Sequence, residues 1–144
     1  MEKRSFSVDS GIVEFEVNDK RSIYFNPSDH GFLNRLYDTT ENLSKIMTTA
    51  KEEMKKATGA ALFEISRKED ADLRAEVDGL LGEGFCQDVF GDVRLSAISD
   101  GLTIVENLLY AIIDEMDSSL TENMKRRDAR VRKYTDKYAK KYHR

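Results

Sequence analysis

The chain has little of several residue types: one cysteine, one proline, two histidines and no tryptophan in 144 residues. A single cysteine cannot form an internal disulfide, so the composition does not call for an oxidising compartment. No apolar run approaches the roughly 20 residues that cross a bilayer. The basic start MEKRSFSVDS is not followed by the apolar run of a secretory signal. We therefore expect a soluble, cytoplasmic protein.

Few residues could support acid–base, nucleophilic or zinc chemistry. His30 and His143 are the only histidines, and neither stands in a recognisable pattern with a serine or cysteine nucleophile. A zinc site needs several clustered Cys and His ligands, which one cysteine and two distant histidines do not supply. Cys86 is therefore interpreted as a buried structural thiol.

Two further patterns are similar to known ligand sites, but neither has the required spacing of residues. Read as a calcium loop, the acidic segment has Arg74 at the third coordinating position and Ala75 where glycine is required. The glycines around residue 85 fit neither a dinucleotide fingerprint nor a phosphate loop. We predict no catalytic residue, no metal site and no cofactor, and hence a protein that is not an enzyme. The carboxylates of the acidic segment are interpreted as a solvated helix face: Asp70, Asp72, Glu76 and Asp78.

The N-terminal region has the pattern of a β-hairpin. Residues 12–17 (IVEFEV) alternate with the period of a half-buried strand, a turn is expected at 18–20, and residues 21–25 suit the returning strand. A short third strand around Phe6 and Val8 is left open. Because an exposed strand edge favours pairing between chains, the hairpin is a candidate subunit contact. The residues assigned to it are Val13, Phe15, Val17 and Ile23.

Two helices are predicted after the hairpin. Asn26 is the expected N-cap of the first helix, with Pro27 at its first position. Apolar residues then recur at spacings of three and four up to the expected end near 58–59. The second helix is predicted over about 66–81, immediately before a glycine. Residues 60–65 could belong to either helix.

A long third helix is predicted to begin at an Asp100 N-cap, and its apolar stripe runs to Met124. The following residues, 125–144, hold ten Lys or Arg and two Asp, a net charge of +8, which leaves −12 for residues 1–124. Such asymmetry is typical of an arm that contacts a polyanion or another protein. A solvated helix end is the alternative, since basic residues complement the helix dipole there.

Three tyrosines of this basic tail repeat every four residues, at Tyr134, Tyr138 and Tyr142. They share one face if the segment remains helical. This face could bind a partner by stacking and charge. It could also dock on another copy of the chain, which is the interpretation that we favour.

The stretch GEGFCQDVFGD, residues 82–92, places an apolar stripe inside a segment rich in glycine and aspartate. We predict a joint between two helices here. Two interpretations of Phe85, Val89 and Phe90 remain open. They could form a surface for a subunit or another partner, or they could close the core between the helices.

The order of these elements resembles that of a known family. The motifs are FNPSD (25–29) after the hairpin, DGLLGEG (78–84) at the end of a carboxylate-rich helix, and VFG (89–91). In this order they resemble the tail assembly chaperones of long-tailed phages and prophages of Gram-positive hosts. The resemblance implies a non-enzymatic chaperone that binds the tape measure protein during virion morphogenesis and keeps it soluble.

The sequence thus predicts one α+β, mostly α domain. It consists of a hairpin region (1–26) packed on a helical body (27–124), followed by a basic helical tail (125–144). A homo-oligomer is expected, because a coat of many small helical subunits could shield a long apolar helix. The alternative function is a nucleic-acid-binding or structural phage protein that acts through the tail. The acidic body makes nucleic acid the less favoured partner, since it repels phosphate.

Overall fold

The computed structural model describes the backbone of residues 1–142 and their side chains except those at 138 and 140–142. With 65% helix and a small antiparallel N-terminal sheet, it confirms an α+β, mostly α fold. The elements, in chain order, are β1 (Val13–Val17), β2 (Arg21–Phe25), α1 (His30–Lys56), α2 (Ala60–Leu81), α3 (Phe85–Phe90), β3 (Ile98–Ser99), β4 (Leu102–Thr103) and α4 (Ile104–Tyr142).

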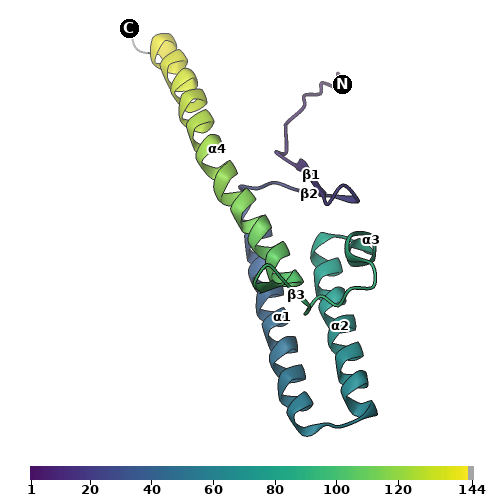
Figure 1. Cartoon of the computed structure of the whole chain (residues 1–144). Helices are drawn as coiled ribbons and strands as arrows, with labels where there is room; N and C mark the ends of the chain where they lie inside the picture. The colour runs from purple at the N-terminus through teal and green to yellow at the C-terminus, as the bar shows by residue number, and fades with distance from the viewer. Residues whose placement is uncertain (143–144) are drawn as a thin grey trace.

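The helices α1 and α2 form an antiparallel pair, and α4 begins beside the half of this pair that lies nearest the hairpin (Figure 1). From there α4 extends well past the body, and its C-terminal half has no neighbouring element in Figure 1. The hairpin and α3 cover the same end of the pair. Within residues 1–142, no helix combines the length and apolar character needed to cross a membrane.

The predicted hairpin is confirmed. Val13 pairs with Phe25 and Val17 with Arg21, and Asn18 and Asp19 have the positive φ angles that let the turn follow the strand twist. The third strand considered around residues 6–8 is wrong, because residues 1–12 have no regular structure. Their apolar side chains contact little of the body, and that of Phe6 is 91% exposed.

The start of α1 lies three residues after the predicted one. Asn26 caps a turn instead of the helix, because its Oδ1 accepts a hydrogen bond from the backbone N–H of Ser28 at 2.9 Å. Asp29 is the N-cap and accepts from the N–H of Gly31 at 2.8 Å. The helix ends close to the predicted residues 58–59. The unassigned residues 60–65 belong to α2.

The start of α4 also differs from the prediction. Asp100 and Gly101 have positive φ angles and form the turn of the small β3–β4 hairpin, so Asp100 is not an N-cap. Thr103 and Glu106 form a capping box instead. The Glu106 N–H donates to Thr103 Oγ1 at 3.1 Å, and the Thr103 N–H donates to Glu106 Oε1 at 2.9 Å.

The hydrophobic core lies between the hairpin, the halves of α1 and α2 nearest the hairpin, α3 and the first half of α4. An aromatic stack crosses it: the ring centroids of Phe15 and Phe25 are 4.7 Å apart, and those of Phe25 and Phe32 are 4.3 Å apart. The stack fixes both strands to α1. The largest fully buried side chains are Phe85, Leu36, Leu43, Leu73, Leu95, Val77, Val105 and Cys86.

Candidate functional site

The glycine-flanked joint begins with a turn that is built around Arg21 of β2. Arg21 Nη1 donates to the Glu83 carbonyl at 2.7 Å and to Asp88 Oδ2 at 2.9 Å. Gly82 has a φ of 132°, and a Cβ there would lie 2.9 Å from Arg21 Nη2. The turn therefore needs glycine for its backbone angle and for the close approach of the guanidinium. It ties the hairpin to the end of α2.

The short helix α3 turns its apolar stripe inward. Phe85 and Cys86 are 0% exposed and Val89 is 2% exposed. Phe90 is half-buried and meets Phe85 edge to face, with the ring centroids 6.2 Å apart. In this conformation Phe85 and Val89 close the core and present no surface to a partner. Phe90 alone of the three reaches a groove, of about 350 Å³, between the hairpin turn and α4.

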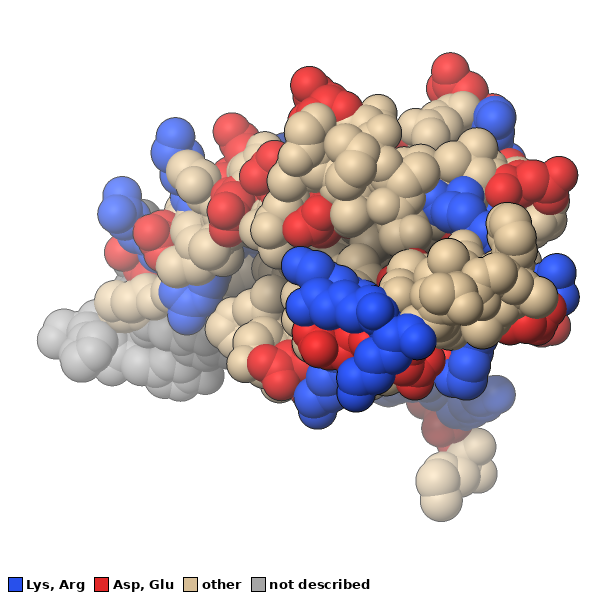
Figure 2. Space-filling view, turned by 60° about the horizontal axis from the view of Figure 1, so that its bottom comes forward, with Lys and Arg blue, Asp and Glu red and all other residues tan. Residues whose placement is uncertain are grey.

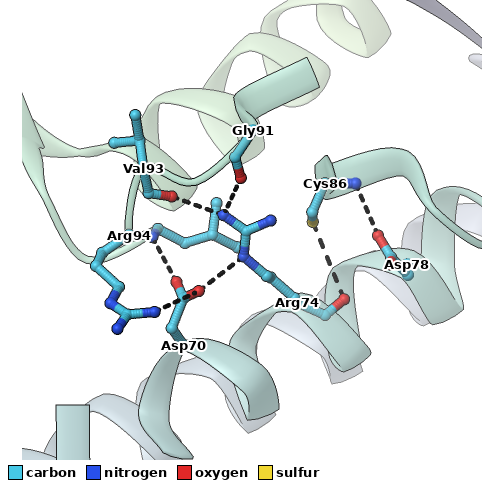
Figure 3. A network of polar contacts seen from close by, with 8 residues as sticks. Asp70, Arg74, Asp78, Cys86, Gly91, Val93 and Arg94 are labelled. Atoms are coloured by element: carbon cyan, nitrogen blue, oxygen red, sulfur yellow. Dashed lines mark hydrogen bonds and ion pairs between the residues drawn. The ribbon is translucent and has the colours of Figure 1, made fainter. Parts of the chain in front are cut away.

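A buried carboxylate fixes the loop after α3 to α2 (Figure 3). Asp70 is 5% exposed, and its Oδ1 accepts from the Leu95 N–H at 2.8 Å. Its Oδ2 pairs with Arg74 Nε at 2.7 Å. Arg74 Nη2 in turn donates to the carbonyls of Gly91 and Val93, each at 2.7 Å. The prediction of a solvated acidic face is wrong for Asp70.

A second carboxylate of α2 holds the start of α3. Asp78 Oδ1 accepts from the Cys86 N–H at 2.9 Å, so it caps the short helix from outside (Figure 3). Burial of the Cys86 thiol and its hydrogen bond to Asp78 raise the pKa of the thiol to about 12. Because the thiolate is the reactive form of cysteine, Cys86 is inert in the folded chain, in agreement with its interpretation as a structural residue.

We expect a thiol reagent to label Cys86 only when the protein opens. At pH 8 labelling should be far slower than in urea, and its rate should follow the unfolding equilibrium. The raised pKa means that the folded chain holds the proton more tightly than the unfolded chain. This stability is present below pH 9 and should be lost as the pH rises towards 12. Fast stoichiometric labelling of the native protein would contradict this account.

The second candidate surface is the projecting part of α4. From Asp117 to Lys137 every side chain is exposed except half-buried Ser119. Four apolar side chains on this stretch are each 45–47% exposed, and we refer to them as the α4 stripe: Leu120, Met124, Val131 and Tyr134. Their spacings of four, seven and three residues place them on one side of the helix. The stripe continues the buried positions of the first half of α4, which end at Met116.

Of the tyrosine ladder, Tyr134 belongs to the stripe, whereas the side chains of Tyr138 and Tyr142 lie outside the described part of the structure. Arg130, one turn before Tyr134, lowers the pKa of the Tyr134 hydroxyl by hydrogen bonding and by its charge. The tail thus combines cationic groups with the exposed aromatic ring of Tyr134.

The four hairpin residues predicted as a subunit contact differ in how far their side chains are buried. Ile23 is buried, Phe15 and Val17 are half-buried against the core, and Val13 is exposed. Of these four side chains only that of Val13 is exposed, and among the described strands β1 and β2 pair only with each other, so each has one unpaired backbone edge. The rest of the body shows acidic and basic side chains interspersed on the face seen in Figure 2.

Among the described residues, no group of three or more His, Cys, Asp or Glu side chains is arranged to hold a metal ion. No family model, no curated protein and no solved structure matches this chain. Two candidate sites are thus present in the described part of the chain, the joint and the α4 stripe. Of these, the stripe is the one whose apolar side chains are open to a partner.

Proposed function

We propose that the protein is a phage tail assembly chaperone, which binds the tape measure protein in the host cytoplasm and keeps it soluble during tail morphogenesis. The observation that carries the proposal is the α4 stripe. Residues 117–137 of this helix stand away from the body, and among the described residues no other helix or strand covers the apolar side chains of the stripe. Surfaces of this kind mark interaction sites with a helical or apolar partner.

The side chains of the α4 stripe suit a tape measure protein, which we call the client. A tape measure protein is a long helical chain with apolar seams, and a seam is covered by laying another helix along it. The stripe offers Leu, Met, Val and Tyr side chains, of which methionine adapts to irregular partners. Each contact would be modest, and repetition along a long client would add them together. No bond needs to be made or broken, so the proposed activity is non-enzymatic.

In the proposed function the joint holds the body in a fixed shape and does not contact the client. Its buried polar side chains are each hydrogen-bonded within the described structure, and they hold α3 and the following loop against α2. The same loop holds the start of α4, where the Val105 N–H donates to the Leu95 carbonyl at 3.1 Å. The stripe is thereby presented from a fixed platform, which lowers the entropy cost of binding.

Co-expression with a tape measure fragment tests the function. The fragment should remain in the soluble fraction with the wild-type chain and precipitate with a variant that carries both Leu120→Asp and Met124→Asp. The matched control is Ser118→Asp, an exposed residue on the opposite side of the same helix. Equal rescue by the double variant and the control would overturn the assignment of the stripe as the client site.

The basic tail favours one second candidate, an accessory protein that binds nucleic acid. Ten Lys or Arg residues in 125–144 would neutralise phosphates, and binding would fall steeply with salt. The net charge of −12 on the remainder opposes a broad nucleic-acid surface. Titration of duplex DNA at two salt concentrations separates the candidates, since tight and salt-sensitive binding would favour the second.

A further inference from the structure

The α4 stripe has one gap, and a charged residue fills it. Leu120 and Met124 are four residues apart, and Val131 and Tyr134 are three apart. Between these pairs, Arg127 lies three residues after Met124 and four before Val131. The five positions therefore alternate in steps of four and three, which is the spacing of the seam that a helix presents to a partner helix. Arg127 is the only charged seam position between Leu120 and Tyr134.

The guanidinium of Arg127 is open to solvent. Its side chain is 65% exposed, and its Nη1 lies 3.7 Å from Oδ1 of Asp128, whose side chain is 64% exposed. A surface ion pair of this kind contributes little, so it does not fix the guanidinium in place. A helix laid along the stripe would remove water from Arg127, and a charge that loses water is costly unless it meets an opposite charge. The seam therefore selects a partner that brings a carboxylate to this layer.

The charges beside the seam differ between its two sides. With about 100° of rotation per residue, Arg130 lies on one side of the seam and Asp128 on the other. A groove of about 670 Å³ along this part of the helix is lined by Arg126, Arg127 and Arg130 together with uncharged side chains. Residues 117–134 as a whole hold six Lys or Arg and three Asp or Glu, so their net charge is +3. The exposed surface around the stripe is therefore complementary to an acidic partner.

We propose that the client segment bound by the α4 stripe is an amphipathic helix with a Glu or Asp within its own apolar seam, opposite Arg127, and further carboxylates on the side that faces Arg130. A second copy of this stretch suits the site less well, because it brings Leu, Met, Arg, Val and Tyr to the seam and no carboxylate. Nucleic acid is disfavoured because apolar side chains precede and follow Arg127 along the seam. This proposal rests on the proposed function and specifies the chemistry of the client.

Two labelled helical peptides test the pairing with Arg127. They share a leucine seam and a row of glutamates on one side, and they differ only at the central seam position, which is Glu in one peptide and Leu in the other. The full chain should bind the Glu peptide at least about tenfold more tightly, since the Leu peptide leaves a desolvated guanidinium without a partner. Arg127→Leu should reverse this preference. Fluorescence anisotropy at nanomolar peptide measures the dissociation constants.

Arg130→Glu tests the side of the seam, and Arg132→Glu is its matched control. Arg132 is also exposed and lies about 160° round the helix from Arg130. Arg130→Glu should weaken binding of the Glu peptide by about tenfold, because it places like charges together. Arg132→Glu should change binding by no more than about twofold, because salt screens a charge that does not touch the peptide. Circular dichroism checks that both variants keep the helix content of the wild type.

Equal binding of the two peptides by the wild-type chain, binding of neither, or displacement of the Glu peptide by duplex DNA at the same concentration would overturn the proposal. A dimer, seen by light scattering, that Leu120→Asp abolishes and the Glu peptide does not disrupt would also overturn it, by assigning the stripe to a second copy.

Co-expression with the tape measure fragment separates this proposal from the proposed function. If the fragment stays soluble with the wild-type chain and equally with Arg127→Glu, the acidic client is wrong and the proposed function stands. If the fragment precipitates with the wild-type chain, the proposed function itself is wrong. Loss of solubility with Arg127→Glu but not with Arg132→Glu is the result that we expect.

Discussion

Replacing Asp70 with alanine is expected to lower the free energy of unfolding by about 3–5 kcal/mol, the usual cost of removing one partner from a buried ion pair. The change leaves Arg74, whose side chain is 17% exposed, without its carboxylate. It also leaves the buried N–H of Leu95 without an acceptor. Since small domains are stable by only about 5–15 kcal/mol, this variant should unfold at a much lower urea concentration.

The matched control for Asp70 is Asp72, two residues along the same helix. Its carboxylate pairs with Lys68 at 2.8 Å at the surface, where both side chains are well exposed. Asp72→Ala should change stability little, because surface ion pairs contribute little. Equal losses for the two variants would show that Asp70 does not fix the loop, and that the α2–loop network of Figure 3 is not a stabilising feature.

Replacing Phe85 with alanine should cost about 3–5 kcal/mol, because the ring is fully buried and its removal leaves a cavity. Urea unfolding monitored by circular dichroism measures the loss, and Phe85→Leu should recover a large part of it. Phe63→Ala is the control of the same residue type, since Phe63 is 72% exposed on α2. Its effect should lie within about 0.5 kcal/mol of wild type. A stable Phe85→Ala variant would mean that the joint does not close the core.

Most of the fold follows from the spacing of apolar residues and from the turn-forming residues that separate the helices and strands. The alternation in IVEFEV is sufficient to predict β1, and the glycine after Leu81 marks the end of α2. The helix starts were missed at Asn26 and Asp100 for a shared reason. Asn and Asp form turns as readily as N-caps, and only the neighbouring structure decides which they do. In the second case the Thr103–Glu106 capping box was present in the sequence as the better indication.

The packing of the joint could not be predicted from the sequence alone. The pattern could not decide whether Phe85 and Val89 point inward, because that depends on how α2, α3 and α4 meet. The prediction of a solvated face covers all four acidic residues of α2, yet Asp70 is buried and Asp72 is not. Asp70 lies three residues before buried Leu73 and seven before buried Val77, so its place on the apolar face was readable from helical spacing.

The α4 stripe was the most predictable part of the candidate site. Its residues continue the apolar spacing of the buried half of the helix, and the exposure of the tail agrees with its composition. What the sequence did not predict is how far α4 stands clear of the body. That depends on the length of α1 and α2, which cover only the first turns of α4 (Figure 1).

Hydrogen exchange of the purified chain, with and without a helical fragment of the tape measure protein, tests the central claim most directly. The protein is used at a concentration where light scattering shows a monomer, so that self-association does not mask the effect. The proposed function predicts slower amide exchange in residues 117–134 and little change in α1 and α2. Protection confined to the body, or no protection at saturating fragment, would contradict it.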